Sequence, residues 1–286
     1  MTDRATDLDA SLDEREWRLI REESRDGAMN MALDEIAGET AASGGPRTVR
    51  VYRWEPSTLS LGYRQNPSTV DWEFCEREGI TVTRRPTGGG GIYHDSWGDL
   101  SYSIAAPAAE LPGDLMESYE LLCAPVLDAF ERLGVEVRFA AESRPAVYGP
   151  ACYLRALHPA HDVVAADGRK ISGNAQHRRR DSVVQHGSVQ FACVPEAHLA
   201  VFAGGVTPEE FGERVTSIRE QADGATDAVG ERDRASAVRA FEDALGEWTD
   251  AEEGEWTDDE LDRARERASE KYEAKDWNRD REAPAR

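Results

Sequence analysis

Apolar side chains recur along this chain at two different spacings, which predict helices in some segments and strands in others. In residues 29–39 (MNMALDEIAGE) apolar side chains return every three to four positions, the spacing of one helix face. Residues 48–54 (TVRVYRW) instead alternate, as in a half-buried strand. The same two patterns predict further helices at 72–78 and 115–133, and further strands at 57–63, 80–85, 99–105, 161–165, 170–176 and 183–191.

The order of these segments predicts the fold class. Strands follow one another with helices interspersed, without strict strand–helix alternation, which favours an α+β fold with a mixed, mostly antiparallel sheet and packed helices. Beyond residue 208 the chain becomes acidic, and helices are expected at 235–247 and 258–273. We predict a disordered acidic tail over 1–14, one folded domain over 15–205, and an acidic helical extension packed on that domain over 206–286.

The charge balance excludes some functions. The 286 residues carry 56 acidic and 34 basic side chains, a formal net charge of −22. A nucleic-acid-binding protein needs a basic face to neutralise phosphates, so nucleic acid is excluded as a partner. Acid excess with scarce lysine is typical of a salt-rich, halophilic cytoplasm, where carboxylates keep the surface hydrated. The sequence has no run of 18 apolar residues and no apolar N-terminal segment, so no membrane span, membrane partner or signal peptide is predicted.

Lys170 is a candidate catalytic residue because lysine is otherwise almost absent. Of the 34 basic residues, three are lysines: Lys170, Lys271 and Lys275. An ammonium group is a compact charge that approaches a phosphate or acyl oxygen end-on. Alternate side chains of a strand share one face, here Lys170, Ser172, Asn174 and Gln176. Small residues between them leave room for a ligand: Gly173 and Ala175. The alternative is an edge strand with a polar outer face.

A run of glycines forms a second candidate site. Gly88 to Gly91 carry no side chain and tolerate positive φ, so the backbone can wrap round a ligand with its N–H groups forming an anion nest. Two arginines precede the run, and His94-Asp95 follows it. The spacing matches neither a P-loop nor a Rossmann turn. The alternative is a flexible hairpin tip.

The cysteines indicate a reduced, cytoplasmic chain. All four are scattered and lack the C-x2-C spacing of a metal site: Cys75, Cys123, Cys152 and Cys193. Cys152 lies in a Gly-Pro loop (GPACY, 149–153) upstream of Lys170. It is either a nucleophile whose thiolate Lys170 stabilises or a small buried hydrophobic residue. Asp162, at the start of a predicted strand, is a candidate magnesium ligand near phosphates.

Taken together, residues 84–95 (RRPTGGGGIYHD) and 168–176 (GRKISGNAQ) resemble the signature segments of the lipoate–protein ligase and octanoyltransferase family, part of the biotin/lipoate ligase group. Further similarity lies at 30–35, 54–65, 185–188 and 271–278. The resemblance implies that 15–205 is a biotin/lipoate ligase-type catalytic domain, related to class II synthetases, which acylates one lysine of an apo lipoyl domain. The implied carriers are the acyltransferase subunit of a 2-oxoacid dehydrogenase and the glycine-cleavage H protein.

The resemblance leaves two chemistries open. In the ligases, lipoate and ATP with Mg²⁺ form lipoyl-adenylate, and the lysine matching Lys170 contacts the acyl carbonyl and the phosphate. Octanoyltransferases use no ATP and take octanoyl from an acyl carrier protein through a cysteine, which matches Cys152. They tend to place an arginine where this chain has Gly90, so the unbroken glycine run favours the ligase, our main prediction. The region after 205 is too short for the extra domain of larger ligases, which implies an accessory subunit or activation elsewhere.

Two other classes fit less well. A non-enzymatic module that sequesters lipoyl domains does not explain Lys170 or the His94-Asp95 pair, and biotin ligases do not share the glycine-loop arrangement. We therefore predict Lys170 and Cys152 as catalytic and Asp162 as a metal ligand. Substrate and nucleotide binding is assigned to Arg84, Arg85, Thr87, Gly88, Gly89, Gly90, Gly91, Tyr93, His94, Asp95, Gly173, Asn174 and Ala175.

Overall fold

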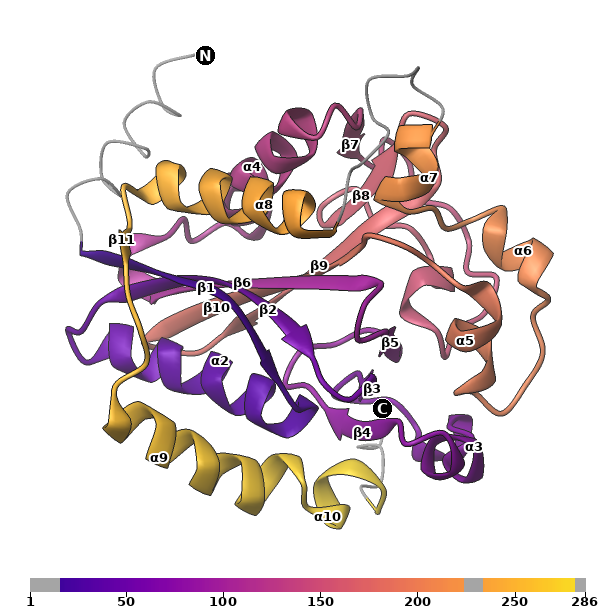
Figure 1. Ribbon diagram of the computed structural model, residues 1–286, viewed down its shortest axis with the longest axis horizontal. Coiled ribbons are helices and arrows are strands. Elements are labelled where there is room, and N and C mark those ends of the chain that lie inside the picture. Colours follow the sequence, from indigo (N-terminus) through magenta and orange to yellow (C-terminus); the bar gives the residue numbers. More distant parts are fainter. Residues whose placement is uncertain (1–15, 224–233, 281–286) are drawn as a thin grey trace.

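A computed structural model describes residues 16–223 and 234–280 of the chain (Figure 1). The tail predicted over 1–14 lies outside the described residues. An eight-stranded sheet has the order β11-β1-β2-β6-β10-β9-β8-β7, and a three-stranded sheet has the order β4-β3-β5. The strands are β1 (Trp17–Arg25), β2 (Arg47–Trp54), β3 (Thr58–Leu61), β4 (Thr81–Arg84), β5 (Ile92–His94), β6 (Asp99–Pro107), β7 (Val137–Phe139), β8 (Asp162–Ala165), β9 (Lys170–Arg178), β10 (Ser182–Gln190) and β11 (Glu252–Glu253).

The predicted fold class is confirmed. Neighbouring strands run antiparallel from β2 through to β7, whereas β1 pairs in parallel with both β2 and β11, and β3 with β4. Helices pack on this mixed sheet: α2 (Gly27–Ala42), α3 (Trp72–Arg77), α4 (Leu115–Arg132), α5 (Pro195–Ala200), α6 (Pro208–Gly212), α7 (Ile218–Asp223), α8 (Arg234–Thr249), α9 (Asp258–Arg267) and α10 (Lys275–Asn278). The helices and strands predicted from the two spacings are all found, with ends displaced by a few residues.

The large sheet carries a helical layer on each face (Figure 1). Helices α4 and α8 cover one face, where Phe130 and Phe241 meet edge to face in the larger core cluster. Helix α2 covers the other face and is itself covered by α9, so Met31, Leu33 and Ile36 are fully enclosed. Burial of this much apolar surface is the main stabilising term of the fold.

A third core cluster fixes the loop that carries Cys152. Leu59 and Ile92, from the small sheet, pack with Tyr153, Leu154 and Phe202. Residues 152–154 form a single 3₁₀ turn, which the small sheet and α5 hold from one side. The glycine loop and the Cys152 loop are therefore held against each other by hydrophobic packing.

The chain beyond residue 205 contributes to both main clusters. Phe241 and Leu245 of α8 pack against the sheet, and β11 extends that sheet beside β1. The boundary placed at residue 205 stays a prediction. Helix α9 is held by a buried ion pair in which both Arg18 guanidinium nitrogens donate to the Glu260 carboxylate, at 2.8 and 2.6 Å.

We expect Glu260→Gln to destabilise the protein by about 3 kcal/mol, because it leaves the Arg18 charge buried without its partner. Burial opposes the ionised form of Glu260, but the hydrogen bonds from Arg18, the Thr257 backbone and Thr40 together outweigh it and lower the pKa to about 2. A lowered pKa adds stability above the unfolded value of about 4.3, and that stability is lost as the pH falls toward 2. Urea unfolding at pH 7 and pH 3 checks this. The difference in free energy of unfolding between variant and wild type must be smaller at pH 3 than at pH 7.

The matched control is Asp262→Asn, on the same helix, whose partner Arg265 is exposed. Exposed pairs contribute about 0–1 kcal/mol, so this variant is expected to unfold like the wild type. A Glu260→Gln gap that stays constant with pH would contradict the assignment.

Candidate active site

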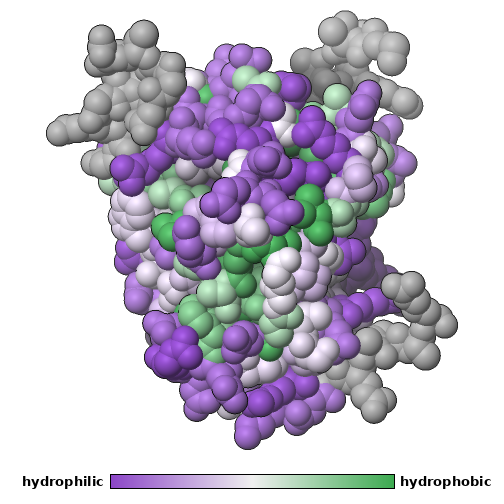
Figure 2. All heavy atoms as spheres, turned by 90° about the vertical axis from the view of Figure 1, so that its right-hand side faces the viewer, coloured by the Kyte–Doolittle hydropathy of each residue, from purple (hydrophilic) through white to green (hydrophobic). Residues whose placement is uncertain are grey.

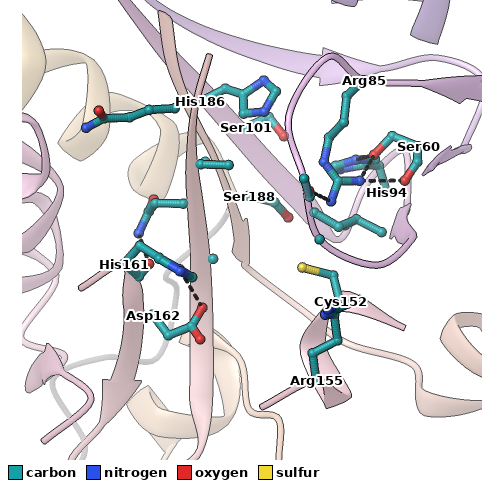
Figure 3. A pocket seen from close by; sticks show the side chains of 18 of the residues that line it. Ser60, Arg85, His94, Ser101, Cys152, Arg155, His161, Asp162, His186 and Ser188 are labelled. Atoms are coloured by element: carbon teal, nitrogen blue, oxygen red, sulfur yellow. Dashed lines mark hydrogen bonds and ion pairs between the residues drawn. The ribbon is translucent and has the colours of Figure 1, made fainter. Parts of the chain in front are cut away.

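A cavity of about 420 Å³ lies between β9 and β10 on one side and the glycine and Cys152 loops on the other. Ten of its lining side chains are labelled in Figure 3. The face of the molecule that carries α3, α5 and α6 is shown in Figure 2, where hydrophobic residues gather in a band across a mainly hydrophilic surface. That hydrophilic surface agrees with the net charge of −22.

The glycine loop is shaped by the buried guanidinium of Arg85. Its Nη2 donates to the carbonyls of Gly88 at 2.8 Å and Gly90 at 2.7 Å, and its Nη1 donates to the carbonyl of Ser60 at 2.7 Å. Gly89 between them has φ +98°, which only glycine adopts readily. Burial lowers the pKa of Arg85, whose hydrogen-bond partners in the described chain are all neutral oxygens.

The loop also presents free donors. Among the described residues, none accepts a hydrogen bond from the N–H groups of Gly88, Gly89 or Gly90. Unpaired backbone N–H groups beside a cavity are the groups that stabilise a developing oxyanion. The anion nest predicted for this run therefore has donors available.

Two histidines beside the loop are fully engaged by protein groups. His94 bonds Ser60 Oγ at 2.8 Å and Asp99 Oδ2 at 3.1 Å, and its ring stacks on Trp54 at 3.9 Å. Burial lowers the pKa of His94 despite the nearby Asp99 carboxylate. His186 is held likewise, by Thr87 Oγ1 at 2.8 Å and Asp34 Oδ2 at 3.2 Å. Both rings are therefore fixed parts of the cavity wall.

Cys152 is the cysteine that lines the cavity, and its sulfur points into it (Figure 3). Its N–H donates to the carbonyl of Gly91 at 2.8 Å, while the N–H of Gly91 donates to the carbonyl of Pro150 at 2.7 Å. Cys152 Sγ and Arg85 Nη2 lie 3.6 and 2.8 Å from the point that a Cβ on Gly89 would occupy. The thiol thus lies close to a buried cation.

The other three cysteines are poor nucleophiles. Burial raises the pKa of Cys75 to about 11, of Cys123 to about 12 and of Cys193 to about 12. A thiol with such a pKa is almost entirely protonated at neutral pH, and the thiolate is the reactive form. Nucleophilic chemistry therefore falls to Cys152.

Lys170 lies at the floor of the cavity, 3% exposed. Its Nζ is 2.7 Å from Asp162 Oδ1 and 3.4 Å from the carbonyl oxygen of Cys152. Burial alone would lower the pKa of Lys170, but the Asp162 carboxylate outweighs it and raises that pKa above its ordinary value. Lys170 is consequently a permanent cation beside Cys152.

Asp162 is occupied by protein donors on both oxygens. Besides Lys170, the N–H of His158 donates to Oδ2 at 2.8 Å. Burial opposes its ionisation, but Lys170 holds the pKa of Asp162 well below its usual range. In the described part of the chain, no three His, Cys, Asp or Glu side chains come together to hold a metal ion. The magnesium role of Asp162 stays a prediction, while its contact with Lys170 is observed.

The shared face predicted for Lys170, Ser172, Asn174 and Gln176 is wrong for Lys170, while the other three stay in regular alternation. The β8–β9 register shifts between Val163 and Val164, so that Lys170 and Ile171 together face Val164. This bulge turns Lys170 to the side of Gly173, with Nζ 3.2 Å from the point a Gly173 Cβ would occupy.

Asn174 has an internal role as well as lining the cavity. Its amide accepts from Tyr102 at 2.6 Å and donates to the carbonyl of His161 at 2.9 Å. It therefore fixes the backbone of the segment that leads into β8.

The predicted binding residues divide into two groups. Those that line the cavity are Arg85, Gly88, Gly89, His94, Gly173, Asn174 and Ala175. Those outside its lining are Arg84, Thr87, Gly90, Gly91, Tyr93 and Asp95. Arg84 instead donates to carbonyls of Gly62 and Gln65 and of the C-terminal Trp277 and Asn278. Sequence reasoning did not assign other lining residues, among them Ser60, Ser101, Tyr119, Arg155, His161 and Ser188.

Gly90 is required by close packing with the Cys152 loop. A Cβ at this position would lie 2.5 Å from the carbonyl oxygen of Pro150 and 2.9 Å from the nitrogen of Cys152. The unbroken glycine run, which we took from the sequence as favouring a nucleotide, thus has a packing reason that involves no nucleotide. Gly90 therefore no longer favours the ligase over the octanoyltransferase.

We expect Gly90→Ala to destabilise the protein by about 1–3 kcal/mol, because either the Cys152 loop or the glycine loop must move. Gly88→Ala is the matched control in the same run, since no atom lies within 4 Å of its Cβ position. Urea unfolding of the two variants measures the difference, and equal stability would contradict this packing.

The fold and the cavity, with a lysine, a cysteine and a glycine loop around it, are those expected from the resemblance to the lipoate–protein ligase and octanoyltransferase family. The chain belongs to the family of the lipoyl protein ligase A/B catalytic domain, whose model matches residues 26–242. It is 33% identical to octanoyltransferase LipM of Kyrpidia tusciae over 275 residues, covering 92% of this chain and 98% of that protein. It is 32% identical to octanoyltransferase LipM of Anoxybacillus flavithermus over 279 residues, covering 92% and 97%.

Solved structures share the fold. The bi-partite lipoate protein ligase of Thermoplasma acidophilum superposes with a TM-score of 0.72 at 23% identity, covering 92% of this chain and 96% of that one. A lipoate-protein ligase A bound with ATP superposes with a TM-score of 0.72 at 23% identity, covering 92% of this chain and 98% of that one. At this identity they establish the common fold. No helix in the described ranges is long and apolar enough to cross a membrane.

Proposed function

We propose that this protein transfers an octanoyl group from an acyl carrier protein to a lysine of an apo lipoyl domain, with Cys152 as nucleophile. The observation that carries the proposal is the Cys152 thiol in the cavity, on a loop whose Cys152 carbonyl oxygen lies 3.4 Å from Lys170 Nζ, together with the free N–H groups of the glycine loop. The similarity to octanoyltransferases over nearly the whole chain supports it. This is the alternative that the sequence left open, and it replaces the ATP-dependent ligase as the preferred function.

The first half-reaction loads the enzyme. The Cys152 thiolate attacks the carbonyl carbon of the octanoyl thioester, the bond to the carrier sulfur breaks, and the carrier leaves as a thiol with the proton that Cys152 released. Negative charge develops on the carbonyl oxygen, for which Lys170 and the N–H groups of Gly88 and Gly89 are the candidate donors.

The second half-reaction forms the product. The ε-amine of the acceptor lysine attacks the Cys152 thioester, the amide bond forms, and Cys152 leaves and regains a proton. The acceptor would belong to an acyltransferase subunit of a 2-oxoacid dehydrogenase or to a glycine-cleavage H protein.

The ligase alternative requires ATP and Mg²⁺. Asp162, the carboxylate considered for magnesium, is already paired with Lys170, and the glycine run has the packing reason given above. The residues of the cavity therefore give the ligase no separate support.

The test supplies the purified protein and an apo lipoyl domain with either octanoyl-carrier protein alone or lipoate, ATP and Mg²⁺, and reads intact masses. We expect an octanoyl increase on the lipoyl domain without ATP, and a transient octanoyl increase on the enzyme that maps to Cys152. A lipoyl increase that requires ATP, with Cys152 unmodified, would overturn the proposal in favour of the ligase.

A further inference from the structure

The cavity is open at one end and closed at the other. Exposed residues line its mouth, Arg155 and Ala156 among them. Three other lining side chains are almost completely buried: Met31, Tyr52 and Trp54, which are 1%, 1% and 2% exposed. A flexible chain that enters at the mouth must therefore stop at these three side chains.

The register of the large sheet gives the path between the two ends. Four residues that line the cavity are successive partners across the sheet: Gly173 of β9, Ser188 of β10, Ser101 of β6 and Tyr52 of β2. Cross-strand partners point to the same face of a sheet. In Figure 3, Ser188 lies nearer to the Cys152 sulfur than Ser101 does. The path thus crosses three small residues before it meets the Tyr52 ring.

The Cys152 loop lies over the beginning of this path. Lys170 Nζ is 3.4 Å from the Cys152 carbonyl oxygen and 3.2 Å from the point that a Cβ on Gly173 would occupy. The next residue of the loop, Tyr153, donates its hydroxyl hydrogen to the carbonyl of Ser188 at 3.0 Å. An acyl group on Cys152 would therefore begin above β9 and β10 and extend toward β6 and β2.

The two serines of the path have hydroxyls that are bound to the protein. Ser101 donates to Asp99 Oδ2 at 2.6 Å, and Ser188 donates to Asp99 Oδ1. Ser101 also accepts a hydrogen bond from Trp54 Nε1 at 2.9 Å. A hydroxyl with protein partners does not need water, so an alkyl chain can cover it at little cost. The path is consequently both shallow enough and dry enough for a hydrocarbon chain.

The closed end has a fixed part and an adaptable part. The Trp54 ring stacks on His94 with 3.9 Å between centroids and lies 5.7 Å from the Tyr52 ring. Met31 of α2 packs in the same core cluster as both aromatic residues. Methionine is unbranched and fits itself to irregular gaps. Met31 is therefore the residue whose truncation should lengthen the cavity while the aromatic wall stays in place.

The length of the path suits a chain of medium length. Ser188 and Tyr52 are two strands apart, which is about 10 Å at ~4.8 Å between neighbouring strands. An extended octanoyl chain is about 9 Å long from its carbonyl carbon to its methyl group, with C–C bonds of about 1.5 Å. A decanoyl chain is about 2.5 Å longer on the same basis and would press against the closed end.

We propose that Met31, Tyr52 and Trp54 form a stop that limits the acyl group on the cysteine to about eight carbons. The inference rests on the proposed function for the identity of the acyl donor. A longer chain must displace buried side chains, and a shorter chain leaves part of the path unfilled. The octanoyl chain is favoured over both for these two reasons.

The test is a competition among thioesters of one carrier protein that differ only in acyl length: hexanoyl, octanoyl, decanoyl and dodecanoyl. Equal amounts are offered together, and the intact mass of the enzyme shows which chain loads Cys152. One methylene in an apolar pocket changes kcat/KM by about 10–200-fold, so wild type should prefer octanoyl to decanoyl at least about 10-fold. Met31→Ala should reduce this preference about 10-fold or more, because the added methylenes take the space of the thioether.

Met29→Ala is the matched control. Met29 lies on the same helix and in the same core cluster but outside the cavity lining, so this variant should keep the wild-type preference. Ser101→Val is a second variant that acts in the opposite direction. Its branched side chain would fill the path above β6, and hexanoyl should then load faster than octanoyl. Circular dichroism shows which variants fold, and if one does not, the other decides.

Two results would overturn the inference. One is equal loading of all four chains by wild type, and the other is an octanoyl preference that the folded Met31→Ala and Ser101→Val variants both retain. The proposed function fails separately, when no chain loads Cys152. Calorimetry with free octanoate and decanoate then still tests the stop. Wild type should bind octanoate at least about 10-fold more tightly and Met31→Ala should lose this difference, whereas equal binding by wild type would rule the stop out.

Discussion

Replacing Cys152 with serine is expected to lower octanoyl transfer to lipoyl domain at least about 1,000-fold, the scale seen when a nucleophile is removed from a site that works as a unit. A serine hydroxyl is far less acidic than a thiol, and the rings of His94 and His186 are already hydrogen-bonded to protein side chains. Arg85 and Lys170 would remain in place, because neither binds the sulfur directly. The measurement is the initial rate of mass increase of the lipoyl domain with octanoyl-carrier protein.

The control is Cys193→Ser. Cys193 is also half-buried but lies outside the cavity, and burial raises its pKa to about 12, so its loss should leave the rate unchanged. Intact mass should show the octanoyl adduct on wild type and Cys193→Ser and none on Cys152→Ser. Full activity of Cys152→Ser would show that the thiol is not required for octanoyl transfer.

The local patterns predicted most of the fold, because each segment that alternates or repeats does so against one buried face. Strand β1 (WRLIREESR) escaped this reasoning. Its first four residues, Trp17 to Ile20, are all buried, since the strand lies between β2 and β11 with helices on both faces. Arg18 can be buried because it pairs with Glu260, which lies 242 positions further along the chain. No local window contains that partner.

The site likewise combines features that local sequence predicted with features that depend on distant parts of the chain. The glycine run, Cys152 and Lys170 were expected near one another, and the structure places Cys152 against both. The bulge at Ile171 could not be foreseen, because it depends on the register with β8.

Lys170→Arg provides the sharpest test of the lysine that this arginine-rich chain retains. We expect it to slow loading of Cys152 about 100-fold or more, although the charge is kept. The ammonium lies 2.7 Å from Asp162 Oδ1 and 3.2 Å from the Cβ position of Gly173, at a site 3% exposed. A planar guanidinium is larger and would have to push into the cavity where the acyl group must lie. Loading of Cys152 in single-turnover mass spectra measures the effect.

The control is Lys271→Arg, since Lys271 pairs with Glu35 at 2.6 Å outside the cavity and should accept the exchange without loss. Urea unfolding separates chemistry from folding. Lys170→Arg retains a cation for Asp162, whereas Lys170→Met leaves that carboxylate buried without its cation and should lower the free energy of unfolding by about 3–5 kcal/mol. If Lys170→Arg loads Cys152 at the wild-type rate, the ammonium is not required, and the rarity of lysine elsewhere in the chain says nothing about this site. If it folds normally but loads slowly, the compact charge is what the first half-reaction needs.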